Sequence, residues 1–184
     1  MQHSKPGFTF IEIIVVLLII GILAGIGVPA LQNRLPGFKR NEFITEFNAL
    51  INFAWQQSLA THKTHQINID INKRLMAIKV ETDQKSRDGQ SLFKALSDTQ
   101  LPSDYIWPEN IQFKQFFVDG KDMMRGIQTE EMWFFVVPDG MVQPVIMNLI
   151  DTADEDARGE PVQFSLVVNP FTAQVKTYDT FQKP

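Results

Sequence analysis

One carboxylate stands inside a long apolar segment near the start of the chain. In the segment 8–28 the only clearly polar side chains are Thr9 and Glu12. A charged side chain in a membrane helix costs about 2.5–3.5 kcal/mol on insertion scales, so such residues are typically retained for a function. The chemistry open to a carboxylate in this setting is attraction to a cation, which is strong where the dielectric constant is low. Glu12 therefore requires a functional explanation.

Two further groups of side chains could bind a metal ion. His62 and His65 flank a predicted helix-to-strand junction, but no third ligand is nearby, and exposed turn histidines are the favoured interpretation. The acidic residues of segment 151–156 offer the oxygen ligands that Ca²⁺ prefers, yet their spacing matches no EF-hand, and a solvated loop is favoured. They are Asp151, Asp154, Glu155 and Asp156. We expect no metal and no cofactor.

Catalytic motifs are absent from the sequence. No His-Glu-x-x-His, Gly-x-Ser-x-Gly or phosphate-binding glycine loop occurs. The aromatic run Trp133-Phe134-Phe135 is expected to fill a core rather than stack on a ligand. The net charge of −4 gives no electrostatic basis for binding nucleic acid. We therefore expect neither an enzyme nor a nucleic-acid-binding protein.

The residues at the start of the apolar segment form a recognisable motif. Gly7 and Phe8 follow Lys5, and Glu12 is the fifth residue after the glycine. With the apolar length that follows, this resembles the leader of type IV pilins and type II secretion pseudopilins. The resemblance implies that a prepilin peptidase cleaves between Gly7 and Phe8 and that Phe8 is then N-methylated. It also implies that Glu12 attracts the terminal amine of a neighbouring subunit during filament assembly.

The resemblance extends to two residues that weaken a helix. Gly21 and Pro29 lie where these families carry a glycine and a proline in the same helix. The implied organisation has a cleaved leader, a transmembrane and filament-core helix, a kinked amphipathic continuation of that helix, and a β-rich periplasmic domain. The corresponding ranges are 1–7, 8–28, 29–61 and 62–184.

A secretory signal or a plain membrane anchor could also explain an apolar segment here. Secretory signals have apolar cores of about 7–15 residues and disfavour an acid within them, although Gly25-Ile26-Gly27 could serve as a cleavage site. An anchor explains the length, because the segment 8–28 spans roughly 31 Å as a helix. It gives no reason for the charge of Glu12, so both alternatives rank below the leader.

Apolar residues after the membrane segment recur at helical spacing. From Asn41 the stripe recurs at three- and four-residue steps and ends near Thr61, which predicts an amphipathic helix with a break at Pro36-Gly37. Packing of this stripe on the protein's own sheet is favoured over an exposed filament contact. The apolar residues are Phe43, Ile44, Phe47, Leu50, Ile51, Ala54, Trp55 and Leu59.

Beyond His62 the apolar period falls to two, which predicts antiparallel strands. The segments 65–71 and 75–82 flank a turn at Asn72-Lys73, and segment 83–101 is expected to be a loop with a short helix near 92–96. Pro138-Asp139-Gly140 is expected to form a hairpin turn. Further strands are predicted at 111–118, 132–137, 141–149, 162–169 and 174–178. A long helix packed on antiparallel sheets is the α+β arrangement of the pilin-like fold.

One branch of the family resembles this chain most. The segment 54–60 leading into the strand at 66–70 is similar to GspH/FimT-like minor pseudopilins and pilins. The arginine common in that branch at the helix end is not evident, and Gln56 or Gln57 stands near its place. The chain has no cysteine, whereas many true pilins close a carboxy-terminal loop with a disulfide, which favours a pseudopilin.

We therefore expect a minor pseudopilin of a type II secretion system, in the tip complex that primes pseudopilus assembly. The resemblance implies a single-pass inner-membrane protein with its carboxy-terminal domain in the periplasm, although the cations within residues 34–40 argue for the opposite orientation by the positive-inside rule. Implied partners are other minor and major pseudopilins, the prepilin peptidase and the inner-membrane assembly platform. Alternatives are a minor pilin of a type IV or DNA-uptake pilus and, less favoured, a membrane-tethered periplasmic binding module.

Overall fold

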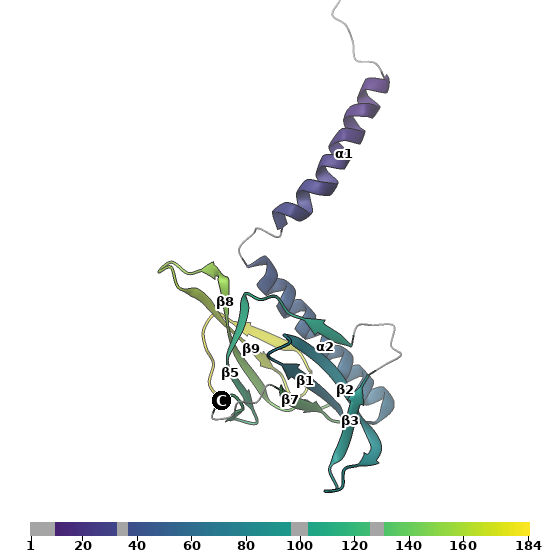
Figure 1. The fold of residues 1–184 in the computed structure, drawn as a ribbon, viewed down its shortest axis with the longest axis vertical. Helices are drawn as coiled ribbons and strands as arrows, with labels where there is room; N and C mark the ends of the chain where they lie inside the picture. Colours follow the sequence, from purple (N-terminus) through teal and green to yellow (C-terminus); the bar gives the residue numbers. More distant parts are fainter. Residues whose placement is uncertain (1–9, 33–36, 97–102, 126–130) are drawn as a thin grey trace, which may run out of the picture. The chain divides into compact units, whose positions relative to one another are not determined.

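The computed structural model describes residues 10–32, 37–96, 103–125 and 131–184, with only the backbone described for residues 24–32. The chain divides into two compact units, Met1–Phe38 and Lys39–Pro184. Helix α1 (Phe10–Gln32) belongs to the first unit (Figure 1). Nearly all of helix α2 (Phe38–Thr61) and all the described strands belong to the second.

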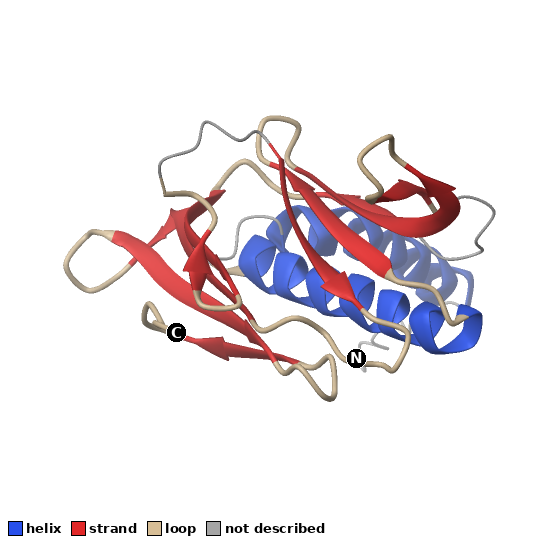
Figure 2. Ribbon diagram, turned by 90° about the horizontal axis from the view of Figure 1, so that it is seen from below, coloured by secondary structure: helices blue, strands red, loops and turns tan. Residues whose placement is uncertain are grey.

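Within the described residues, ten strands form two antiparallel sheets, which we call sheets A and B (Figures 1 and 2). Sheet A has the order β3-β2-β1-β7, with β4 also paired to β2, and sheet B has the order β10-β9-β8-β5-β6. The strands are β1 (His65–Asp70), β2 (Leu75–Lys85), β3 (Ser91–Ala95), β4 (Asp104–Ile106), β5 (Ile111–Val118), β6 (Lys121–Asp122), β7 (Glu131–Val136), β8 (Val145–Glu155), β9 (Pro161–Val168) and β10 (Val175–Tyr178). A helix packed on antiparallel sheets confirms the predicted α+β class.

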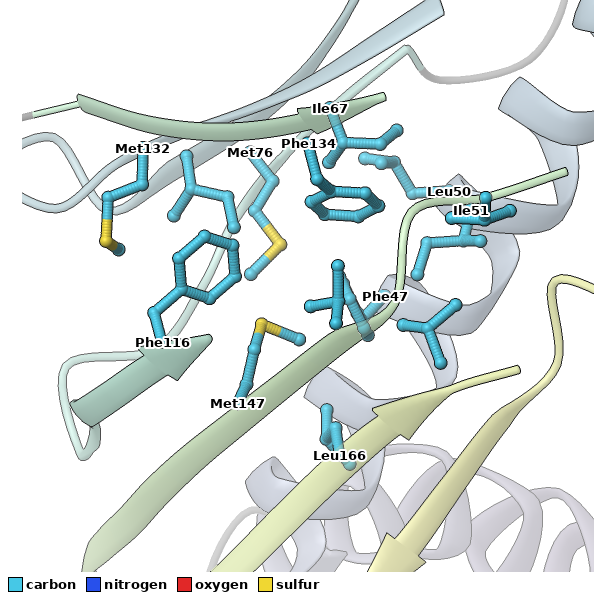
Figure 3. Close-up of a cluster of buried hydrophobic side chains, with 14 of the residues drawn as sticks. Phe47, Leu50, Ile51, Ile67, Met76, Phe116, Met132, Phe134, Met147 and Leu166 are labelled. Carbon is cyan, nitrogen blue, oxygen red and sulfur yellow. The ribbon is translucent and has the colours of Figure 1, made fainter. Parts of the chain in front are cut away.

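The core lies where α2 meets the inner faces of both sheets. Residues Phe43, Phe47 and Ile51 recur along one side of α2 and are fully buried. This spacing places them on one face of a helix, so their burial removes a continuous apolar stripe from water. Figure 3 shows side chains from α2, sheet A and sheet B converging in one cluster, among them Phe47, Leu50, Ile51, Ile67, Phe134, Met147 and Leu166. The prediction that the stripe packs on the protein's own sheets is confirmed, except that Leu59 near its end is 38% exposed.

The ends of α2 follow the conformations of the residues beside them. Gly37, directly before α2, has a φ of 74°, which a glycine adopts readily. After Thr61 the chain leaves the helix at His62, whose φ of 54° is the left-handed conformation common after a helix end. The helix thus ends where the periodicity predicted. Pro36, half of the predicted break, lies outside the described residues. The single long helix with a membrane-spanning half stays a prediction.

The predicted loop at 83–101 is wrong at 83–85 and 91–95, which are strand, and right at 86–90, which form the turn between them. Strand β2 continues to Lys85, and β3 pairs with it through residues such as Phe93, which lies opposite Glu81. The predicted helix near 92–96 is therefore strand over Leu92–Ala95, and residues 97–102 lie outside the described part. The hairpin forms because β2 offers a free edge to the returning chain, which is information that the local sequence does not contain.

Two predictions around residues 138–149 also need correction. The strand predicted at 141–149 begins at Val145 and runs on to Glu155. The turn at Pro138–Gly140 does form, since the Gly140 N–H donates to the Val137 carbonyl at 2.9 Å. It does not join two strands of one sheet, because β7 belongs to sheet A and β8 to sheet B. After the turn, Val142 forms an isolated β-bridge with Val136.

Candidate functional site

Helix α1 exposes apolar side chains all around its described part. From Phe10 to Leu23 the large apolar side chains are 42–80% exposed. A helix that is apolar on every face is stable only where lipid or other protein surrounds it. This surface therefore requires a cover that the single chain does not provide.

Counted over the described residues alone, no helix reaches the length and hydropathy that crossing a membrane requires.

Glu12 lies in the first turn of α1 and its side chain is exposed. A carboxylate there is stabilised by the positive end of the helix dipole, by about 0.3–1 kcal/mol. Glu12 is also the one acidic side chain of the described apolar surface, so it supplies the charge that could select a partner. Gly7 and Phe8 lie outside the described residues, and cleavage and N-methylation at these residues stay predictions.

Gly21 and Pro29 both lie within α1. A Cβ added at Gly21 would meet nothing within 4 Å, so no close packing inside the described chain requires a glycine there. Pro29 lies in the helix interior, where it cannot donate the usual backbone hydrogen bond. The assigned helix continues through both residues in this single chain. Because both residues weaken a helix, we predict that segment 21–29 bends or extends when the subunit enters a filament.

The two histidines occupy different environments, and the prediction that both are exposed in a turn is wrong for His65. His62 is exposed, whereas His65 begins β1 and is fully buried, because its side chain shares the inner face of sheet A with Ile67. Its Nδ1–H donates to the Lys63 carbonyl at 3.0 Å, and within the described residues its Nε2 has no hydrogen-bond partner. Burial lowers the pKa of His65, against a smaller raising effect of the Lys63 carbonyl.

The acidic segment 151–156 is mostly strand, which corrects the predicted solvated loop. Asp151 is 1% exposed and accepts a hydrogen bond of 2.6 Å from Asn110 Nδ2. Asp154 pairs with Arg40 of α2 at 3.0 Å, a contact between residues far apart in the sequence. Only Asp156 lies in a turn, where the backbone N–H groups of Arg158 and Glu160 lower its pKa. Asp151 and Asp154 thus each bond to another part of the chain, whereas Asp156 bonds within its own turn.

No group of three potential metal ligands occurs among the side chains that the structure describes.

The aromatic run is divided between the two faces of sheet A. Phe134 is fully buried in the core, as predicted. Trp133 is 39% exposed, so the prediction that it fills the core is wrong. The ring of Phe135 lies 5.4 Å from that of Phe93, at a tilt of 31°, on the outer face. Beside them is a hollow of about 530 Å³ that Trp133 also lines. Strand alternation explains the division, because successive side chains of β7 point to opposite faces.

Comparisons with known proteins concern the segment at the start of the chain and the fold. Residues 3–28 match the family model described as the prokaryotic N-terminal methylation motif. Comparison with curated protein sequences gave no match. The fold is similar to a crystal structure of the minor pseudopilin EpsH from the type II secretion system of Vibrio cholerae, at 11% identity and a TM-score of 0.50, covering 76% of this chain and 95% of that one. A second structure of EpsH gives 13% identity and a TM-score of 0.47, covering 75% of this chain and 94% of that one.

Proposed function

We propose that this chain is a minor pseudopilin of a type II secretion system. Its segment 8–28 would anchor it in the inner membrane, in a single pass, with the Lys39–Pro184 unit in the periplasm. The observation that carries this proposal is the methylation motif at residues 3–28 on a chain whose folded unit is similar to EpsH. The motif supports processing by a prepilin peptidase, with cleavage after Gly7 and methylation of Phe8.

The exposed surface of α1 supports assembly with other subunits. Apolar side chains on every face can be covered by helices of like character, and Glu12 would then orient each neighbour by attracting its terminal amine. Partners of this kind are the other minor and major pseudopilins and the inner-membrane platform that assembles them. In this role the chain works by packing and not by catalysis, and we propose that it belongs to the tip complex that primes the pseudopilus.

A deletion of the gene in the source bacterium tests this function. We expect the activity of exported enzymes to accumulate in the periplasm and fall in the medium, and expression of the full chain from a plasmid to restore export. Twitching motility and DNA uptake, measured in the same strain, should be unchanged. Loss of either with normal secretion would instead identify a minor pilin of a type IV or DNA-uptake pilus.

The remaining alternative is a membrane-tethered periplasmic binding module. It differs from both filament roles in needing no leader processing. Replacing Gly7 with a bulky residue should leave unprocessed precursor and stop secretion if the chain enters a filament. Normal secretion by an unprocessed variant would favour the tethered module.

A further inference from the structure

The last residues of the chain form a strap across the outer face of sheet B. Residues 179–184, which we call the strap, have no regular secondary structure. The Thr180 carbonyl accepts a hydrogen bond of 2.8 Å from Ser165 Oγ of β9. The Gln182 N–H donates to Asn148 Oδ1 of β8 at 3.1 Å, and Asn148 Nδ2 donates to the Gln182 carbonyl at 2.9 Å. The strap thus crosses β9 first and β8 next.

Two buried polar side chains fix the strap in place. The neighbours of Asn148 and of Ser165 along their strands point into the core, so these two side chains point to the outer face. Both are nevertheless fully buried. Asn148 Nδ2 also donates to Gln115 Oε1 of β5 at 2.7 Å. The Ser165 hydroxyl has one hydrogen, which it shares between the Thr180 carbonyl and Asn148 Oδ1, the latter at 2.6 Å. Buried polar groups are costly when left without partners, so this network favours one position of the strap.

The strap ends beside the β5–β6 turn. Pro184 Cβ lies 3.7 Å from the place where a Cβ on Gly120 would stand. This brings Lys183 to a hollow of about 700 Å³ that Lys114 and Arg125 also line. Lys114 is the extra residue of an irregularity in the β5–β8 ladder, between Phe113 and Gln115, and such bulges redirect side chains.

The hollow is cationic on a protein whose net charge is −4. Lys114, Arg125 and Lys183 are all exposed, and none forms an ion pair with another described residue. Among the described residues that line the hollow, Asp122 has the one acidic side chain, and its Oδ1 accepts the Met124 N–H at 3.0 Å. The remaining wall is partly apolar, being lined by Phe117, Met124 and Pro184. A local positive potential with apolar walls is complementary to an anionic ligand that also carries apolar groups.

We propose that this hollow, which we call the strap groove, binds an acidic polypeptide segment of a partner protein. Such a segment can place carboxylates against the three cations and apolar side chains against Phe117 and Met124. The wall is concave and combines charge with apolar surface. It therefore fits a peptide of alternating acidic and apolar side chains better than it fits the headgroup layer of a membrane. The inference goes beyond the proposed function, since it concerns the Lys39–Pro184 unit and requires neither leader processing nor Glu12.

The test uses the full chain, purified in detergent micelles, and a short fluorescein-labelled peptide of alternating glutamate and leucine. Fluorescence anisotropy should show saturable binding that weakens as salt is raised. Lys114→Glu, Arg125→Glu and Lys183→Glu should each weaken binding about tenfold, because each replaces an attraction by a repulsion. Arg87→Glu makes the same charge change in the exposed β2–β3 turn and should leave binding unchanged.

Two further probes complete the experiment. A peptide with glutamine in place of glutamate should bind much more weakly than the acidic peptide. Binding to phosphatidylglycerol vesicles should be the same for the wild type and for the three groove variants. The proposal is overturned if the acidic peptide does not bind saturably, if both peptides bind equally, if Arg87→Glu weakens binding as much as the groove variants do, or if vesicle binding alone depends on the groove.

Discussion

At the scale of single residues, Glu12 carries the most specific expectation. In the processed chain the Phe8 amine would lie about 6 Å along the helix from Glu12, on a similar face, so a lone subunit can neutralise itself. A filament neighbour displaced along the axis could instead place its own amine beside Glu12. Desolvation offsets much of the attraction, so we expect the pair to set registry more than stability.

Replacing Glu12 by glutamine keeps the shape of the side chain and removes its charge. We expect the Glu12→Gln variant to be cleaved and inserted like the wild type, to co-purify poorly with partner pseudopilins and to lower secretion. Immunoblotting for the processed form, affinity co-purification and exported enzyme activity measure the three effects. Wild-type co-purification together with wild-type secretion would exclude the assembly role.

His65 gives a pH dependence whose sign follows from its burial. The buried imidazole has a lowered pKa, whereas in the unfolded chain it titrates near 6.5. Below about pH 6.5 the unfolded state therefore binds a proton that the folded state does not, and the free energy of unfolding falls until the pH reaches the folded-state pKa. The stabilisation is complete above pH 6.5, and its loss on acidification amounts to at most about 1.4 kcal/mol per pH unit.

Substitution of the two histidines separates this effect from general acid sensitivity. His65→Asn retains a donor for the Lys63 carbonyl and should flatten the fall in unfolding free energy between pH 7.5 and pH 5.5. His62→Asn changes an exposed side chain and should leave the fall unchanged. Chemical denaturation of the full chain in detergent, followed by tryptophan fluorescence, measures both. Equal slopes in the wild type and in His65→Asn would contradict the assignment.

At the scale of elements, the contact of α2 with the two sheets buries the apolar stripe of the helix in the core. Phe47 is fully buried and stacks on Phe43 with ring centroids 6.3 Å apart. Phe47→Ala should lower the free energy of unfolding by about 3–5 kcal/mol, because it leaves a cavity among side chains from three elements. Phe171→Ala removes a ring that is 74% exposed in the β9–β10 turn and should change it by about 0.5 kcal/mol or less. Denaturant titration measures the free energy of unfolding of both variants. A similar decrease in Phe47→Ala and Phe171→Ala would show that α2 is not the centre of the core.

The elements that sequence reasoning identified are those whose pattern is local. Helix α2 and strand β1 were predictable because one side of each is apolar at the period of its own backbone. Strand β3 was missed because it lies at a sheet edge, where Leu92 is exposed, so burial does not impose an alternating pattern. The acidic end of β8 does not read as strand because it is polar and mostly exposed, at the tip of the β8–β9 hairpin, where Glu155 lies opposite Pro161 across a register shift.

At the scale of the whole molecule, the two candidate sites differ in how far the sequence reveals them. The predicted leader and Glu12 lie within one short segment, so the resemblance to pilin leaders is visible in the sequence. The cations of the strap groove come from β5, from the segment after β6 and from the strap. Only the topology of sheet B brings Lys114, Arg125 and Lys183 together, and no spacing in the sequence signals it. The burial of His65, in contrast, follows from a local pattern, because it lies two residues before Ile67 in the predicted strand and so shares its inner face.

The processed amino terminus tests the central claim most directly. Intact-mass measurement of the protein purified from its own membrane, with fragmentation of the amino-terminal peptide, identifies both the cleavage point and any methyl group. We expect a chain that begins at Phe8 and carries one N-methyl group, and a Gly7 variant with a bulky side chain that retains its leader. A mature chain cleaved near Gly27, or a full-length unmethylated chain in the wild type, would contradict the assignment to a pilin-type filament.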